Sequence, residues 1–313
     1  MAAPRLGSPT ALDIVDGVDL TGKTCVITGA SAGLGRESAR ALATTGAHVI
    51  LAARKVAALR DAQDWIRSEV PAASMSVVEL DLTSLASVRT AAAVVRDLAP
   101  QIHVLMNNAG VMFTPFGRTA DGFEIHFGTN HLGHYALTRL LTPHLAEGGR
   151  IVILSSDGHR MSDVDLDDPN WERREYDKFA AYGASKTANV LHMVDLDRRL
   201  RDRGVRAYAV HPGVVATSLA RHMKRDDFER LTRLEPADPD QERIDVRHDF
   251  LMPEHGAATQ VWAAVSPELA DTGSVYLADC RIRDDVAPYA MDDAHAAELW
   301  DRSEKLCDAG IHP

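Results

Sequence analysis

Short apolar runs alternate with amphipathic stretches from residue 24 to residue 277 of this 313-residue chain. Seven runs are rich in Val, Ile or Leu, and they lie at 24–28, 48–52, 76–80, 102–106, 150–154, 205–210 and 274–277. Continuous apolar runs are typical of strands covered on both faces, and helices between them are typical of crossover connections. The pattern predicts an α/β fold with a doubly wound, seven-stranded parallel sheet and helices on both faces.

The predicted helices lie between these runs, at 36–44, 56–69, 85–98, 128–145 and 183–202. The chain contains no internal repeat, low-complexity tract or linker rich in Gly, Pro and Ser that would divide it. We therefore expect an N-terminal extension over residues 1–19 and a single domain over residues 20–313.

Two segments are unusually rich in charge. Ten of the 17 residues in 162–178 and 16 of the 30 residues in 221–250 are charged. The second segment keeps a partial apolar face made of Phe228, Leu231 and Leu234. Both segments fit solvated loops and surface helices. The second also fits a substrate lid over residues 214–252, because lids in such folds lie beyond the carboxyl ends of the strands.

The charge balance excludes some classes of function. The chain has 34 Lys and Arg against 45 Asp and Glu, a net charge of −11, which disfavours a nucleic-acid partner. Its 14 histidines and three distant cysteines form no zinc pattern, so no metal site is expected. No stretch approaches the roughly 20 apolar residues of a membrane span. We expect a soluble, cytoplasmic protein.

A glycine-rich turn follows the first predicted strand. It reads Thr-Gly-Ala-Ser-Ala-Gly-Leu-Gly over residues 28–35 and leads directly into a helix. Glycines permit a tight turn, and the helix N-terminus offers free N–H groups to a pyrophosphate. Tight packing would use the same residues, but after a strand and before a helix the turn indicates a dinucleotide site on a Rossmann-type fold.

Tyr182 and Lys186 lie four residues apart on a predicted helix, so their side chains share one face. A phenol has an unperturbed pKa of about 10, and a nearby cation lowers that value. Tyr182 can then exchange a proton with a carbonyl or alcohol oxygen. An ordinary amphipathic helix would also place such a pair, so the two residues gain meaning only from the motifs around them.

Together with Asn-Asn-Ala-Gly at 107–110, these motifs resemble the short-chain dehydrogenase/reductase family. The resemblance covers residues 20–282 and implies a catalytic tetrad of Asn130, Ser156, Tyr182 and Lys186, with Ser155 as the alternative serine. In this family the serine holds the substrate oxygen, the lysine also holds the nicotinamide ribose, and the asparagine anchors a water that leads toward solvent. Helices carrying Asn130 and Tyr182 commonly form dimer faces there, which leaves a homo-oligomer open.

The end of the second predicted strand reads Leu-Ala-Ala-Arg-Lys over residues 51–55, without an acid. An acid there would bind the ribose of NAD, whereas an arginine accommodates the 2′-phosphate of NADP. We therefore predict NADP(H) in preference to NAD(H). The expected cofactor contacts are Gly29, Ser31, Gly33, Leu34, Gly35, Arg36, Arg54, Asp81, Leu82, Asn108, Ala109, Gly110, Tyr182, Lys186, Pro212, Gly213 and Thr217. Asp81 fits a helix cap as well.

The segments 130–135, 265–269 and 279–280 are most similar to the retinol-dehydrogenase-like branch of the family. The sequence thus predicts an NADP(H)-dependent oxidoreductase that transfers a hydride between nicotinamide and a lipophilic alcohol or carbonyl substrate. A non-catalytic NADP(H)-binding sensor or scaffold and an isomerase or dehydratase of nucleotide sugars are the alternatives. Met112, Phe113 and Phe116 fit either a substrate pocket or the packing of a loop.

Overall fold

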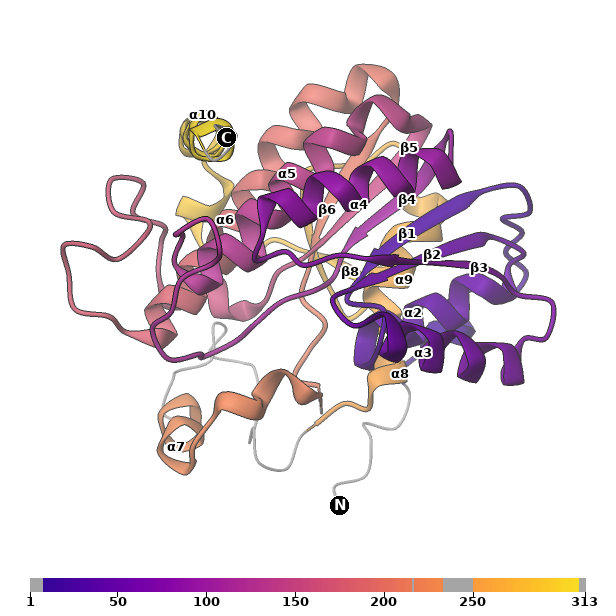
Figure 1. Cartoon of the computed structure of the whole chain (residues 1–313), viewed down its shortest axis with the longest axis horizontal. Helices are drawn as coiled ribbons and strands as arrows, with labels where there is room; N and C mark the ends of the chain where they lie inside the picture. The colour runs from indigo at the N-terminus through magenta and orange to yellow at the C-terminus, as the bar shows by residue number, and fades with distance from the viewer. Residues whose placement is uncertain (1–7, 216, 233–249, 310–313) are drawn as a thin grey trace.

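The computed structural model describes residues 8–215, 217–232 and 250–309 (Figure 1). In this part of the chain a single sheet has the strand order β3-β2-β1-β4-β5-β6-β7-β8. The strands are β1 Thr24–Thr28, β2 His48–Ala53, β3 Ser74–Glu79, β4 Ile102–Asn107, β5 Leu145–Leu154, β6 Arg206–Val210, β7 Val275–Ala278 and β8 Arg281–Arg283. All seven pairs are parallel except β7 with β8, which is antiparallel. The doubly wound sheet is confirmed.

The sheet has one more strand than the seven expected, the antiparallel β8 at one edge. The eighth strand has only three residues, and Arg281 and Arg283 flank the half-exposed Ile282. Asp279 and Cys280 turn the chain with φ of 51° and 53°, a conformation that usually needs glycine. Neither an apolar run nor a glycine marks this hairpin in the sequence.

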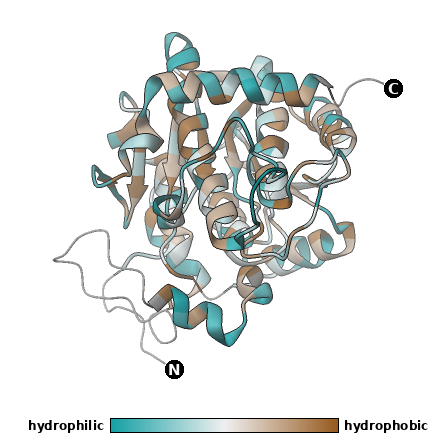
Figure 2. Cartoon of the chain, turned by 90° about the vertical axis from the view of Figure 1, so that its left-hand side faces the viewer, coloured by the Kyte–Doolittle hydropathy of each residue, from teal (hydrophilic) through white to brown (hydrophobic). Residues whose placement is uncertain are grey.

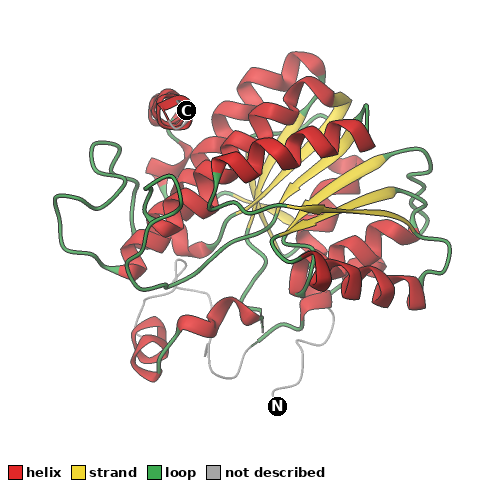
Figure 3. Ribbon diagram, in the orientation of Figure 1, coloured by secondary structure: helices red, strands yellow, loops and turns green. Residues whose placement is uncertain are grey.

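Helices cover both faces of the sheet (Figure 3). One layer contains α2 Gly33–Thr44, α3 Val56–Glu69 and α9 Ala258–Val265, and the other contains α4 Leu85–Leu98, α5 Gly133–Leu141, α6 Lys178–Leu200 and α10 Asp293–Ala309. Shorter helices are α1 Ala11–Ile14, α7 Arg225–Thr232 and α8 Pro253–Gly256. Single turns of 3-10 helix are η2 Thr142–His144, η3 Asp157–Met161, η4 Arg201–Arg203, η5 Ser218–His222, η6 Pro267–Leu269 and η7 Pro288–Met291.

Alternate residues of each central strand enter opposite sides of the core. In β1, Val26 packs toward α4, α5 and α6, while Cys25 and Ile27 pack toward α2 and α9. All three side chains are fully buried. Successive residues of a strand point to opposite faces, so a strand covered twice must be apolar throughout. Figure 2 shows this as brown strands between helices with teal outer surfaces.

The predicted helix over 128–145 is divided in the structure. It consists of a π-helix, η1 Phe127–Leu132, then α5, then the turn η2, and β5 already begins at Leu145. π-Helical turns are rare and occur mostly at functional sites. The predicted helix over 183–202 instead begins at Lys178, where the side chain of Asp177 caps it by accepting from the Phe179 amide at 2.8 Å.

Residues 8–19 of the expected N-terminal extension contain α1, whose buried Ala11 packs with Val15, Ala257 and Val261; residues 1–7 lie outside the described part. Of the expected lid over 214–252, residues 216 and 233–249 also lie outside it. Among the helices that the structure describes, none is both long enough and apolar enough to cross a bilayer.

Candidate active site

A cleft of about 670 Å³ opens at the carboxyl ends of β1, β2 and β4. The strand order reverses between β1 and β4, and such switch points hold the ligands of doubly wound folds. Twelve of the expected cofactor residues line the cleft: Gly29, Ser31, Gly33, Leu34, Gly35, Arg54, Asp81, Leu82, Asn108, Ala109, Gly110 and Thr217. The cleft is large enough for a drug-sized or cofactor-sized ligand.

The glycine turn has the geometry that an anion site needs. Gly29 and Gly33 have φ of 69° and 55°, and a Cβ on Gly35 would lie 2.5 Å from the carbonyl oxygen of Gly29. The N-cap of α2, Ala32, has no side chain that bonds the first amides of the helix. Because uncapped amides at a helix N-terminus bind phosphate, the residues present fit the pyrophosphate of a dinucleotide.

Thr28 and Asn108 tie the glycine turn to the loop after β4. The side-chain amide of Asn108 donates to the carbonyl oxygen of Thr28 at 2.7 Å. The hydroxyl of Thr28 accepts from the backbone amides of Asn108 and Ala109, at 2.9 and 3.0 Å. The two loops that line the cleft therefore form one hydrogen-bonded unit.

His134 connects that unit to the helix that carries Asn130. Its Nδ1 donates to the carbonyl oxygen of Asn130 at 2.9 Å, so its Nε2, 2.9 Å from the Thr28 hydroxyl, is the acceptor. Burial lowers the pKa of His134 to about 4, against a smaller opposing effect of the bond to Asn130. A neutral imidazole thus joins the glycine turn to the candidate catalytic residues.

Asn130 lies on η1 and is fully buried. Its side chain accepts from the amide of Val111 at 2.8 Å and donates to the Val111 carbonyl at 3.0 Å and to Ser185 Oγ at 2.9 Å. A Cβ on Gly110 would lie 3.2 Å from Asn130 Oδ1 and 3.8 Å from Lys186 Nζ. Asn130 therefore positions the loop after β4 next to the lysine.

Tyr182 lies on α6 and is 4% exposed, and a Cβ on Gly158 would lie 2.7 Å from one carbon of its ring. Burial raises the pKa of Tyr182 to about 12, and the hydrogen bond with Ser156 opposes the rise. Lys186 is not among the causes of this shift, so the lowering of the Tyr182 pKa expected from the lysine is absent here. The phenol is protonated at neutral pH and can act as an acid.

Lys186 is buried one turn further along α6. Its Nζ donates to the carbonyl oxygen of Leu154 at 3.0 Å and lies 5.7 Å from the centre of the Tyr182 ring. Burial lowers the pKa of Lys186 to about 8. Neither Tyr182 nor Lys186 is among the residues that line the cleft, but Gly110 and Leu154, beside Lys186, both line it.

The two serines after β5 point in different directions. Ser156 hydrogen-bonds Tyr182, and its Oγ also accepts from the Gly158 amide at 3.0 Å. Ser155 is 2% exposed and donates to the backbone carbonyl of Lys186 at 2.9 Å. Ser156 therefore faces the phenol of Tyr182, and Ser155 fixes α6 against β5.

Three other expected cofactor residues lie outside the lining of the cleft. The guanidinium of Arg36 stacks on Trp65 at 4.2 Å and lies 3.9 Å from Glu37. Pro212 and Gly213 only lead from β6 toward Thr217, which lines the cleft. Asp81 does line it, but its carboxylate also accepts from the amide and hydroxyl of Thr83, at 2.9 and 2.8 Å, as a turn cap would.

An apolar group surrounds the phenol of Tyr182. The ring centre of Phe113 lies 4.9 Å from that of Tyr182 and 4.3 Å from that of Phe179. Four partly buried side chains pack against this group: Met112, Met161, Met223 and Leu231. Met223 and Leu231 come from the expected lid.

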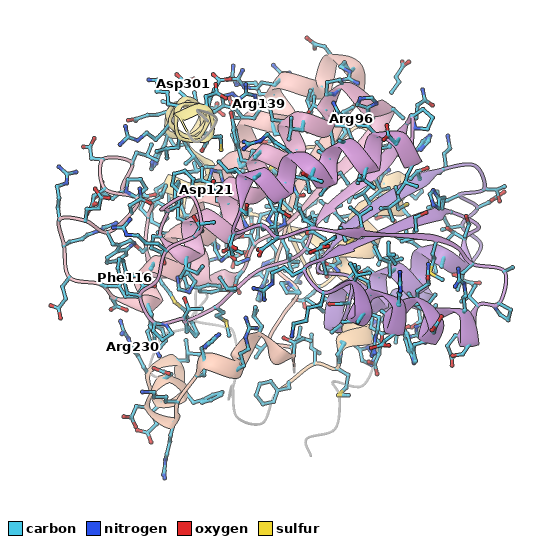
Figure 4. All side chains as sticks on the ribbon, viewed as in Figure 1. Arg96, Phe116, Asp121, Arg139, Arg230 and Asp301 are labelled. Carbon is cyan, nitrogen blue, oxygen red and sulfur yellow. The ribbon has the colours of Figure 1, made fainter. Side chains whose placement is uncertain are left out.

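Helix α7 is fastened to the start of α6 by two ion pairs. Lys178 Nζ lies 2.6 Å from Asp227, and the guanidinium of Arg230 lies 2.7 Å from Asp177 and 4.1 Å from the centre of the Phe179 ring. Figure 4 shows Arg230 on α7, which lies outside both helix layers in Figure 1. Two charged residues of α7, Asp227 and Arg230, therefore contact the body of the molecule.

Sequence reasoning missed several residues of the site. Thr28, Lys55, Arg221 and His222 also line the cleft, and His134 connects its two sides. The position of Thr28 at the end of β1, immediately before the turn, could have suggested its role. Arg221 and His222 lie in a charged segment that carries no motif, so the sequence held no signal for them.

Comparisons with known proteins agree with this geometry. The family model described as short chain dehydrogenase matches residues 23–227. Human retinol dehydrogenase 14 is 37% identical over 98% of this chain and 93% of its own length, and human retinol dehydrogenase 12 is 39% identical over 92% and 87%.

A crystal structure of an uncharacterised protein from Mycobacterium Paratuberculosis superposes with a TM-score of 0.71 at 34% identity, over 98% of both chains. The chain belongs to the short-chain dehydrogenase family. Within the family it falls in the retinol-dehydrogenase-like branch, as predicted. Members bind a nicotinamide dinucleotide and transfer a hydride, so this chain is an oxidoreductase of alcohol and carbonyl groups.

Proposed function

We propose that the protein is an NADP(H)-dependent oxidoreductase that interconverts lipophilic alcohols and their ketones or aldehydes. The observation that carries the proposal is the position of Tyr182, whose phenol interacts with Ser156 and packs within an apolar group beside the cleft. A protonated phenol in such surroundings suits the reduction of a carbonyl with little polar surface around it.

The dinucleotide would be held by the residues that line the cleft. The uncapped amides of α2 would bind its pyrophosphate, and Arg54 and Lys55, without an acid beside them, would suit a 2′-phosphate on the adenosine ribose. When bound, the nicotinamide supplies or accepts a hydride. We propose that Tyr182 and Lys186 also contact its ribose, as the family resemblance implies, and that Pro212 and Gly213 frame the nicotinamide.

The chain's own residues handle the proton. Tyr182 donates it to the substrate oxygen, and Ser156 stabilises the charge that develops there. Lys186 and Asn130 are both buried, and the ammonium of Lys186 lies 5.7 Å from the centre of the Tyr182 ring. We propose that Asn130 anchors a water molecule that leads from Lys186 toward solvent. The proton that Tyr182 donates would be replaced along this route.

The lipophilic substrate class has two supports. Met112, Met161, Met223 and Leu231 surround the phenol, and methionine adapts to apolar ligands of different shape. The relatives named retinol dehydrogenases share more than a third of their residues with this chain. We propose that α7, within the expected lid over 214–252, covers this substrate while the ion pairs to α6 hold.

The decisive experiment is turnover with NADPH and with NADH on a panel of ketones and aldehydes from short polar carbonyls to retinal. We expect NADPH to be preferred and kcat/KM to rise with the apolar surface of the substrate. Tight NADPH binding without turnover on any carbonyl or alcohol would favour the non-catalytic sensor instead.

We also propose that the protein works in the reducing environment of the cytoplasm. Cys25, Cys280 and Cys307 are all free thiols, as expected where disulfides do not persist. Fractionation of cells that express the full chain, followed by immunodetection, tests this placement.

A further inference from the structure

Phe113 has a backbone conformation that an aromatic residue rarely adopts. Its φ is +50°, in the left-handed region, yet its side chain is only 1% exposed. A non-glycine residue stays there only where its surroundings hold it, and such residues gather at functional sites. Phe113 follows Gly110 by three residues, on the loop that lines the cleft.

This conformation places the Phe113 ring beside the phenol that would protonate the substrate. The two ring centres are 4.9 Å apart with an interplanar angle of 68°, and Phe113 also packs on Phe179 at 4.3 Å. A substrate oxygen that reaches both Tyr182 and Ser156 brings one of its carbon substituents toward this ring. In that pose the ring would limit the space on one side of the carbonyl.

A buried pair, Glu124 and His126, holds the residue that follows Phe113. Nε2 of His126 accepts from the Thr114 amide at 3.2 Å, with the Thr114 hydroxyl at 3.3 Å, so its Nδ1 carries the proton that bonds Glu124 at 2.8 Å. Both His126 and Glu124 are fully buried.

The carboxylate of Glu124 is itself fixed from two further directions. It accepts from the Phe127 amide at 2.8 Å and from the Tyr176 hydroxyl at 3.0 Å. The imidazole of His126 lies with its ring centre 6.1 Å from that of Tyr182, without a hydrogen bond between the two. A buried charge with all its partners in place is a rigid support, so the tautomer of His126 and the position of Thr114 are both set.

We propose that Phe113 determines how large a group the enzyme accepts on one side of the substrate carbonyl, and that Glu124 and His126 are positioning residues that hold Phe113 in this conformation. The inference rests on the proposed function, since it assigns a limit to the same substrate site. This size limit would favour methyl ketones and aldehydes that carry a long apolar group on the other side of the carbonyl.

The test compares two ketones with the same long alkyl chain, one a methyl ketone and the other a phenyl ketone. We expect Phe113→Ala to raise kcat/KM for the phenyl ketone relative to the methyl ketone by about tenfold or more, the usual scale for a change of pocket size. The Kd for NADPH should remain within about twofold. Phe116→Ala is the matched control, because Phe116 lies on the same loop but is 49% exposed, and its ratio should not change.

The positioning role is tested through His126. His126→Leu cannot accept from Thr114, and we expect it to shift the same ratio in the same direction. His126→Gln can accept from Thr114 and donate to Glu124, so it should restore the wild-type ratio. The double variant with Phe113→Ala should differ little from Phe113→Ala alone, since His126 acts through Phe113.

An unchanged ratio in an active Phe113→Ala enzyme would overturn the specificity role, and fully additive shifts in the double variant would overturn the positioning role. Crystal structures of wild type and His126→Leu give a readout that does not depend on turnover. Phe113 retained against Tyr182 with positive φ in His126→Leu would refute the positioning role. Absence of turnover in wild type would instead count against the proposed function.

Discussion

The ammonium of Lys186 lies 5.7 Å from the centre of the Tyr182 ring, and its hydrogen bond goes to the carbonyl of Leu154 and not to the phenol. At that distance the cation does not overcome the burial of the phenol, whose pKa is about 12. Tyr182 is thus prepared as a proton donor. Lys186 is buried as well, and burial lowers its pKa because the charged form loses its contact with water.

Replacing Tyr182 with Phe removes the proton donor but leaves the ring and its contacts. We expect kcat to fall by about 10²–10⁴-fold, the usual contribution of a general acid, with the Kd for NADPH unchanged within about twofold. Steady-state kinetics and a fluorescence titration with NADPH measure the two quantities. Substantial remaining turnover would show that another group donates the proton.

Lys186 should make the stability of the fold depend on pH. Its pKa is about 8 in the folded chain and 10.5 for the unperturbed side chain, so between these values the unfolded chain binds more protons and stability rises with pH. The cost of burying the cation, up to about 3 kcal/mol, is fully present below pH 8.

Lys186→Met removes that cost. We expect the variant to be more stable than wild type at pH 7 and this advantage to decline between pH 8 and 10.5. Urea unfolding of both proteins across this range measures the difference, and an advantage that stays constant with pH would contradict the assignment.

Arg54 and Arg36 are the two candidates for the residue that sets the preference for NADPH, and a variant of each distinguishes them. Arg54 lines the cleft, so Arg54→Asp should weaken NADPH relative to NADH by about tenfold or more, a loss of at least ~1.4 kcal/mol. Arg36→Ala is the control, because Arg36 stacks on Trp65 outside the lining, and its ratio of the two Kd values should stay near that of wild type. The reverse outcome would assign the preference to Arg36.

The ion pairs between α7 and α6 should act on substrate binding. Lys178→Met removes the partner of Asp227, and we expect KM for a lipophilic ketone to rise by about two- to fivefold with little change in kcat, since partly exposed pairs contribute about 0.2–1 kcal/mol. Added salt should raise KM in wild type more than in the variant. Equal salt dependence of KM in wild type and Lys178→Met would show that this ion pair does not contribute to substrate binding.

His134 should be needed for both stability and cofactor affinity. His134→Leu leaves the buried hydroxyl of Thr28 and the carbonyl of Asn130 without this partner, so we expect a loss of about 1–3 kcal/mol in the free energy of unfolding and weaker NADPH binding. His134→Gln, with one donor and one acceptor, should recover part of both. If His134→Leu were as stable as wild type, the hydrogen bonds of His134 would contribute nothing to the free energy of unfolding.

The sequence predicts the central sheet and the order of its connections, because each buried strand must be apolar and each crossover helix amphipathic. It does not predict β8, since an exposed three-residue strand after Asp279 and Cys280 needs neither an apolar run nor a glycine. The sequence patterns therefore predict the central strands but not the strand at the edge of the sheet.

The site divides in the same way. Gly29 is predicted from the tight turn after a strand, Tyr182 from its spacing to Lys186 on a helix, and Asn108 from the family resemblance. Arg36 was expected in the cleft from its place in the chain alone, while the structure directs its side chain to Trp65, 29 residues further on. Contacts such as Glu124 with His126 and Tyr176 depend on how loops fold over one another, and no spacing in the sequence reports that.

The π-helix η1 has a consequence for how the site tolerates changes in chain length. A π-helical turn holds one residue more than an α-helical turn, so Phe127–Leu132 contains the equivalent of an insertion beside Asn130. Each residue of an α-helix advances the side chain by about 100° around the axis. Deleting one residue here would regularise the helix and rotate Asn130 away from Val111 and Ser185. All six residues are buried, so the packing around this segment constrains both the identity and the number of its residues.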